Sequence, residues 1–279
     1  MVFERLIPIR VAEKKPWELL PLAFLYASVG VLLALWIFPE NASLACVFFG
    51  VMALMPLMVQ LMLFEEKKGE KSGSDVFTHK KAATFFTFMF LGLVLCYAFW
   101  GIVLPYFSSI NLFQLQINVI QQINAGAIGG YTFAAFTKIL LNNVRVLAFA
   151  LLFSFIFGAG AIFILTWNAS VIAVAIADTT RGIVSAGAKA LGLSGVAAYF
   201  HAFGLALARY MVHGIPEIGG YFVGGLAGGI ISIGVIKYHL GSPKFRKVMF
   251  DALNLTILAI FILFVAAVLE VWVSPMIPV

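Results

Sequence analysis

The sequence predicts an all-α fold, a polytopic bundle of about seven transmembrane helices with an interfacial helix and a re-entrant half-helix. Hydrophobic residues make up 63% of 279 positions and charged residues only 11%, whereas soluble domains carry about a quarter charged residues. The mean hydropathy is +1.06. Several apolar runs reach about 20 residues, the helical length that crosses about 30 Å of hydrocarbon. Because unpaired backbone groups in lipid cost several kcal/mol, these runs are expected to be helices.

Six apolar runs are long enough to cross a bilayer, and a seventh is weaker because it contains His201 and Arg209. In chain order, the seven predicted spans cover residues 19–38, 44–64, 82–104, 146–167, 194–212 (the weaker run), 215–236 and 248–272. The lipid bilayer is therefore the expected surrounding, and the cell membrane is the expected location of this multi-pass chain.

Lysine and arginine gather in three segments, and such segments are typical of cytoplasmic loops. Residues 1–18 contain four of them, residues 65–81 five and residues 237–247 four. Seven spans place all three segments on one side, with the N-terminus cytoplasmic and the C-terminus extracytoplasmic, whereas six spans do not. Arg181 and Lys189 are expected in a further inward loop. Topology thus explains the net charge of +6, and no nucleic-acid partner is expected.

The segment after the third predicted span is polar through Asn and Gln but carries no charge over residues 110–130. Its apolar residues recur at helical spacing, which predicts a helix along the outer membrane surface. Residues 133–145 repeat this pattern. They predict an interfacial helix that leads into the fourth span, with Asn142, Asn143 and Arg145 at the interface.

Residues 168–178 are apolar and favour a helix, but about 11 residues at about 1.5 Å each are too few to cross a membrane. We therefore expect a re-entrant or interfacial half-helix. It would include Asn168 and end with Asp178 at the inner interface. A Gly-rich stretch follows and would connect the half-helix flexibly to the fifth span.

The sixth predicted span is rich in glycine, which repeats every four positions in two stripes. The stripes are Gly220, Gly224 and Gly228, and Gly225 and Gly229. Small residues at this spacing let helix backbones approach closely in lipid. Close helix packing is therefore expected, and the same stripes allow self-association into a homo-oligomer. A helix that lines a narrow path is the functional alternative.

Polar residues near the start of this span have two interpretations. Pro216 and Glu217 suit the first turn of a helix, which would place Glu217 at the outer interface. A carboxylate deeper in the bilayer would instead indicate an ion or proton path. Arg209 is expected to reach Glu217 as an ion pair if the two spans form a tight hairpin. Glu270, near the outer end of the last span, has the same two interpretations.

His213 and Glu217, four residues apart, would supply half of a metal site, and His201 is the third candidate ligand. About 18 Å of helix separates His201 from His213, so no metal site is expected. The chain also lacks a phosphate-binding loop, a dinucleotide-binding glycine fingerprint, a zinc-protease motif and a nucleophile elbow. We therefore expect no catalytic residues and no cofactor.

From about Ala82 onward, the chain resembles the stage II sporulation protein M (SpoIIM) family. Four stretches carry the resemblance: the Phe and Asn residues of 136–143, Phe157-Gly158 with Gly160, 213–217 with the Gly-rich span after it, and the acidic, aromatic and Ser-Pro residues of 269–275. Two features depart from the family. Ala169 follows Asn168 where relatives usually have Gly, and two additional spans precede the core.

The resemblance implies a five-span core over residues 82–279 with an outer arm at 105–145. An N-terminal tail, a two-span hairpin and a cytoplasmic loop would fill residues 1–81. In sporulating bacteria the family member is a membrane partner of cell-wall hydrolases during engulfment, a role that we do not carry over to this chain. A non-enzymatic membrane scaffold that organises membrane or extracytoplasmic protein partners is the first hypothesis. The alternative is a transporter, channel or lipid-moving protein with a path near 168–178 and 215–236.

Overall fold

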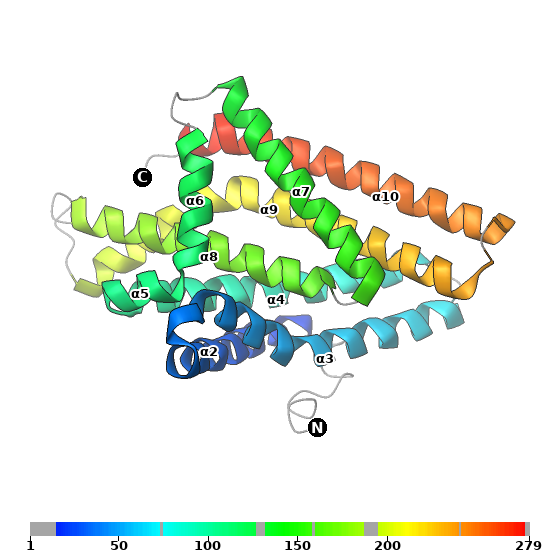
Figure 1. Ribbon diagram of the computed structural model, residues 1–279, viewed down its shortest axis with the longest axis horizontal. Helices are drawn as coiled ribbons and strands as arrows, with labels where there is room; N and C mark the ends of the chain where they lie inside the picture. Colours follow the sequence, from blue (N-terminus) through cyan, green and yellow to red (C-terminus); the bar gives the residue numbers. More distant parts are fainter. Residues whose placement is uncertain are drawn as a thin grey trace.

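The computed structural model describes residues 15–72, 75–126, 132–157, 160–186, 195–239 and 241–276. In this part of the chain all regular secondary structure is helical. Most of the long helices run roughly along one direction, α7 lies obliquely to them, and a shorter helix, α6, crosses them (Figure 1). The predicted all-α membrane bundle is therefore confirmed.

The described elements alternate long helices with short turns. In chain order they are η2 (Pro16–Glu18), α2 (Leu19–Ile37), η3 (Pro39–Asn41), α3 (Ala42–Ser72), α4 (Asp75–Val103), α5 (Tyr106–Leu112), α6 (Gln114–Gly126), α7 (Phe133–Phe157), α8 (Gly160–Ala186), α9 (Gly195–Lys237), α10 (Pro243–Val268), η4 (Leu269–Val273) and η5 (Ser274–Met276). η4 is a π-helical turn, and the other η elements are 3₁₀ turns.

Six stretches among the described residues are long and apolar enough to cross a membrane. They are Pro16–Ile37, Pro39–Met58, Thr84–Val103, Phe133–Leu152, Ile162–Ser185 and Pro243–Met276. The 43-residue helix α9 packs against α7, α8 and α10 and is the seventh long helix of the described chain. Six described stretches thus meet the requirements for a span, against about seven predicted, and several of the predicted borders are wrong.

The predicted fifth and sixth spans are one continuous helix. α9 contains Pro216 in its interior, where the sequence predicts a turn between two spans. At about 1.5 Å per residue, 43 residues extend about 65 Å, roughly twice the thickness of a bilayer core. The hairpin prediction is wrong because α9 continues through Pro216, and a proline within a transmembrane helix is tolerated although it removes one backbone hydrogen bond.

The predicted interfacial helix, fourth span and half-helix are replaced by two long helices. α7 contains residues 133–145 and α8 contains all of 168–178, so neither a separate interfacial helix nor a half-helix is formed. The sequence-based borders are wrong because they treat the asparagines of this region as facing water. Asn143 is instead buried between helices and only 2% exposed.

The turns of the chain gather at two ends of the bundle (Figure 1). The breaks between α3 and α4 and between α9 and α10 lie at one end, where two of the three predicted Lys- and Arg-rich segments fall. We call this the basic end. The α2–α3, α4–α5 and α8–α9 connections lie at the opposite end. The third basic segment, residues 1–18, lies outside the described residues up to Lys14.

Arg181 lies at the opposite end, not in an inward loop as predicted. Its guanidinium Nη2 donates to the carbonyls of Leu104, at 2.7 Å, and Ile102, at 3.3 Å, where α4 ends. The guanidinium also lies 5.8 Å from the ring centroid of Tyr106. α8 therefore ends beside the end of α4, and Asp178 lies there too. Lys189 and the rest of the Gly-rich stretch 187–194 lie outside the described residues.

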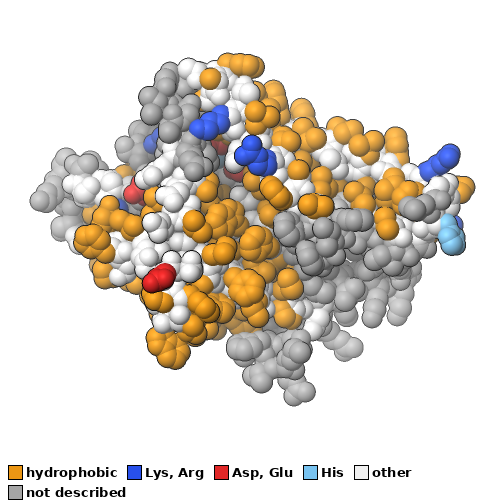
Figure 2. Space-filling model, viewed as in Figure 1, with side chains coloured by type: hydrophobic (Ala, Val, Ile, Leu, Met, Phe, Trp, Pro, Cys, Tyr) orange, Lys and Arg blue, Asp and Glu red, His pale blue; other side chains and the backbone are white. Residues whose placement is uncertain are grey.

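The outer face of α10 is apolar, as expected for a helix that contacts lipid. Exposed apolar side chains recur at helical spacing, at Phe250, Leu253, Ile257, Phe261 and Phe264. The opposite face buries a second, smaller set of residues, namely Ala252, Ala259, Leu263 and Ala266. Hydrophobic side chains likewise cover much of the face that Figure 2 shows. Apolar surface of this extent is expected to lie against lipid.

Candidate functional site

Two glutamates and a histidine meet inside the bundle. His213 and Glu217 lie on one face of α9, since residues four apart in a helix are neighbours. Glu270 comes from η4, the π-helical turn that continues α10. One potential ligand atom from each of the three lies within 4.8 Å of the other two. We call these three residues the polar cluster.

Close packing of α9 brings the polar cluster together. A Cβ atom added at Gly220 would lie 2.7 Å from Leu263 Cγ of α10, and one added at Gly224 would overlap the Leu147 side chain of α7. A larger residue at either position would require these leucine side chains to move. These close contacts hold the preceding turns of α9, which carry His213 and Glu217, near the end of α10. Glu270 lies there, two turns after Leu263. Gly225 and Gly228 lie in the same helix, and the surroundings of Gly229 are outside the described residues.

His213 is held in a fixed orientation. Its side chain is 7% exposed, and its Nδ1 lies 2.8 Å from the hydroxyl of Ser274, which is itself buried. The ring also lies edge-on to Tyr210, with 5.8 Å between the ring centroids. Because Nδ1 has this partner, Nε2 is the nitrogen left to contact a ligand.

Tyr221 links the cluster to α7. Its hydroxyl lies 2.8 Å from Glu217 Oε1 and 3.1 Å from Asn143 Oδ1. A hydroxyl has one proton, so it cannot donate to both oxygens at once. Asn143 Nδ2 is buried and has no partner. Turning the amide by 180° resolves the first problem, since Nδ2 then donates to the hydroxyl and Tyr221 donates to Glu217. Oδ1 then becomes the buried atom without a partner.

The polar cluster borders a cavity of about 240 Å³ between α6, α7, α8, α9 and η4. Its other polar lining comes from Asn142, Asn143, Asn168 and Tyr210, while Trp167 and aliphatic side chains supply most of the remainder. Asn168 Nδ2 donates to the carbonyl of Ile164, one turn earlier in α8. Residues from both predicted path segments, 168–178 and 215–236, thus line one cavity.

Neither glutamate of the polar cluster has a positive partner among the described residues. The ion pairs found between described residues do not include Glu217 or Glu270. The predicted Arg209–Glu217 ion pair is not formed, because both residues lie on α9 and are separated by about 12 Å along it. Two carboxylates close together in an apolar bundle repel each other and lose hydration, so the site favours an added positive charge.

Three other residues singled out from the sequence lie away from the polar cluster. His201 is exposed on α9 and about 18 Å from His213 along the helix, as the sequence spacing requires. Arg145 is exposed on α7. Asp178 is exposed on α8 and lines a different cavity.

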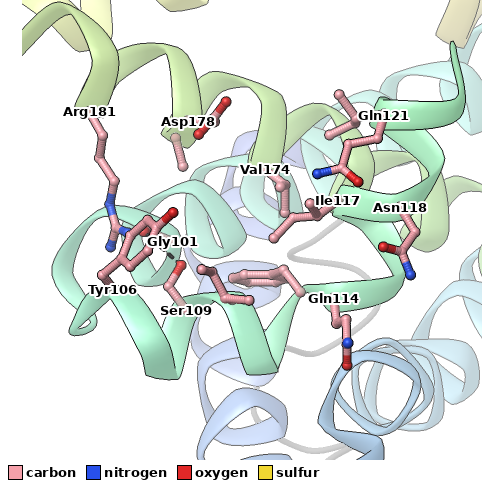
Figure 3. Close-up of a pocket in the computed structure, with 14 residues that line it drawn as sticks. Gly101, Tyr106, Ser109, Gln114, Ile117, Asn118, Gln121, Val174, Asp178 and Arg181 are labelled. Atoms are coloured by element: carbon pink, nitrogen blue, oxygen red, sulfur yellow. Dashed lines mark hydrogen bonds between the residues drawn. The ribbon is translucent and has the colours of Figure 1, made fainter. Parts of the chain in front are cut away.

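This second cavity, about 370 Å³, lies between α8 and the α5–α6 segment Tyr106–Gly126. Figure 3 shows Asp178 and Arg181 on α8 and the amides of Gln114, Asn118 and Gln121 across from them. The dashed line marks the Ser109 hydroxyl, which donates to the Gly101 carbonyl at 3.1 Å. The cavity combines amide groups with one acid and one guanidinium that is already bound to backbone carbonyls.

A family model described as Stage II sporulation protein M matches residues 82–275. The chain belongs to this family. The matched region runs from α4 to η5, so it contains the whole polar cluster of this SpoIIM-family protein, while α2 and α3 precede it. No curated protein and no solved structure matched the chain. Family membership and the apolar helices together identify a multi-pass membrane protein.

Sequence reasoning found the members of the polar cluster but not their association. Glu217, His213 and Glu270 each stand out as polar residues in apolar runs. Glu270 lies 53 positions after Glu217, and no spacing rule connects residues on two separate helices. Tyr221 and Ser274 are not among the site residues that the sequence predicts. A signal for Tyr221 exists, because it lies one helical turn after Glu217.

Proposed function

We propose that this SpoIIM-family protein transports a small cation across the membrane and binds it at the polar cluster. The observation that carries the proposal is the meeting of two carboxylates and an imidazole within 4.8 Å inside the bundle, with no ion pair to either carboxylate from another described residue. Ionisable groups in membrane helices are costly, and they commonly mark ion or proton paths. A cation between the carboxylates relieves their mutual repulsion.

The backbone of α9 supports this role. Pro216 has no N–H, so the carbonyl of Val212 lacks its helical donor beside His213. In transporters, backbone carbonyls that lack a helical donor commonly coordinate cations. The π-helical turn η4 that carries Glu270 is a second irregularity of this kind, and such turns occur frequently at functional sites.

The distribution of Lys and Arg indicates how the protein is oriented in the membrane. We place the basic end in the cytoplasm, because Lys and Arg in short connections stay on that side. Glu270 and Ser274 lie at the far end of α10 from its basic start at Pro243. The polar cluster then belongs to the extracytoplasmic half of the protein, and its cavity is the entry side for a cation from outside.

Flux into liposomes tests the proposal. Purified protein would be reconstituted, and entry of protons, Na⁺, K⁺ and divalent cations would be followed with internal dyes, beside transfer of fluorescent lipids. Wild-type protein is expected to move at least one cation, and Glu217→Gln and Glu270→Gln are expected to reduce that flux by about tenfold or more. Glu40→Gln, at exposed η3, is the matched control that keeps wild-type flux.

A membrane scaffold that organises protein partners is the second candidate, and family membership is the observation that favours it. This role predicts reproducible co-purification of a partner and no cation flux. Folded wild-type protein that moves no tested cation, with both glutamine variants still retaining the partner, would reject transport and favour the scaffold.

A further inference from the structure

We propose that His213, Glu217 and Glu270 bind one divalent transition-metal ion of the Zn²⁺, Co²⁺ or Mn²⁺ type. This inference names the class of cation that the proposed transporter would carry. Only the physiological use of the metal site rests on the proposed transport function. An imidazole nitrogen and carboxylate oxygens together form a donor set that such ions prefer. Mg²⁺ and Ca²⁺ prefer oxygen ligands alone.

The spacing suits a metal after small side-chain rotations. Ligand atoms bound tetrahedrally at about 2.1 Å from zinc lie about 3.4 Å from one another. The three atoms of the polar cluster lie within 4.8 Å of one another. Rotating the terminal carboxylates closes this difference without moving α9 or α10.

The charges also suit a divalent ion. Glu217 and Glu270 have no Lys or Arg partner in the ion pairs found among the described residues, so a 2+ ion would neutralise the pair when both are ionised.

Arg209 acts in the opposite direction. It precedes His213 by one turn of α9, and its positive charge disfavours a cation there. Removing its charge should therefore tighten metal binding.

The neighbouring hydrogen bonds match those of metal sites. A ligating histidine normally has a partner on its other nitrogen, and Ser274 lies 2.8 Å from His213 Nδ1. A ligating carboxylate is normally hydrogen-bonded as well, and Tyr221 lies 2.8 Å from Glu217 Oε1, which leaves Oε2 for the metal. The Ser274 contact thus orients the His213 ring before a metal binds, while the carboxylates rotate into place.

Asn143 gives an independent indication of a missing ligand. Its side chain is 2% exposed, lines the same cavity as the polar cluster, and has one polar atom without a partner. In the amide orientation that satisfies Tyr221, that atom is the carbonyl oxygen. A buried, unpartnered oxygen needs a donor or a cation, which an occupant of this cavity would supply.

Metal binding would be measured on chelator-treated protein in detergent, with Zn²⁺ and Mn²⁺ titrated by calorimetry and Co²⁺ by its visible absorption. We expect one ion per chain, zinc tighter than manganese, and no competition from equal Mg²⁺ or Ca²⁺. His213→Ala and Glu270→Gln should weaken zinc binding about 100-fold, and Ser274→Ala about tenfold. Arg209→Gln should strengthen it.

His201→Ala is the matched control, since it removes an exposed histidine from the same helix and should leave binding unchanged. Circular dichroism and gel filtration would establish that each variant folds. The metal site is rejected if folded wild-type protein binds none of the three ions, if His213→Ala binds zinc as tightly as wild type, or if Ca²⁺ binds equally well.

Binding and transport can fail separately. Zinc binding that depends on His213 without any flux would reject transport and keep the metal site. Flux of protons or monovalent cations that is lost in Glu217→Gln, without metal binding, would reject the metal site and keep the proposed function.

Discussion

At the scale of single residues, the polar cluster depends on neighbours that are themselves buried. Tyr221 is 1% exposed and joins Glu217 on its own helix to Asn143 on α7. Its hydroxyl therefore contributes to the packing of α9 on α7 and to the orientation of the Glu217 carboxylate. Removing only the hydroxyl leaves buried polar atoms without a partner, which usually costs more than the bond itself contributes.

Tyr221→Phe should accordingly lower the free energy of unfolding by about 1–3 kcal/mol. Thermal unfolding in detergent, followed by circular dichroism, measures this loss. Tyr199→Phe removes a hydroxyl from a tyrosine that is 43% exposed on the same helix and should change stability little. Equal effects of the two substitutions would contradict a special role for the Tyr221 hydroxyl.

At the scale of elements, the close approach of α9 to α7 and α10 is set by glycines of one stripe. The added Cβ at Gly224 overlaps a side chain, whereas a Cβ at Gly219, five residues earlier, meets nothing within 4 Å. Both glycines lie inside α9, so alanine raises helix propensity equally at the two sites. Their difference therefore reports packing alone.

Gly224→Ala should destabilise the protein by about 1–3 kcal/mol through overpacking against Leu147. Gly219→Ala should be neutral or stabilising by up to about 1 kcal/mol. Melting temperatures of both variants, measured side by side, provide the comparison. If Gly224→Ala proves as stable as Gly219→Ala, α9 does not pack on α7 as described.

Pro216 marks a second property of α9, a missing backbone hydrogen bond beside the polar cluster. Pro216→Ala restores the N–H that bonds to the Val212 carbonyl, so α9 should become more stable. If the free carbonyl supports cation passage, flux should fall while stability rises. Thermal unfolding and liposome flux of the same preparation test both parts, and a rise in both would argue against a role for the missing hydrogen bond.

At the scale of the whole molecule, the two ends of the bundle differ in charge. Lys244 lies at the start of α10 at the basic end, and Glu40 lies in η3 at the opposite end. Both side chains are exposed. The two native cysteines, Cys46 and Cys96, are buried and free, so replacing them gives a background for site-specific labelling.

In that background, Glu40→Cys should react with an impermeant maleimide added to intact cells, and Lys244→Cys should react only after the cells are opened. Mass-tagged gel shifts report both. Labelling of Lys244→Cys from outside would reverse the proposed orientation and place the cavity of the polar cluster on the cytoplasmic side. The division into an N-terminal hairpin and a core from residue 82 remains a prediction.

The sequence alone determined the class of the protein, because the length and apolar character of a membrane span are local properties. It also singled out Glu217, His213 and Glu270, since an ionisable residue in an apolar run is visible without a structure. Only the tertiary structure decided the borders of α7, α8 and α9. Whether a helix can continue through a proline or bury an asparagine depends on the helices packed around it. Those helices come from distant segments of the chain. The polar cluster was decided in the same way, because packing of α9 against α10 brings together residues that no sequence period connects.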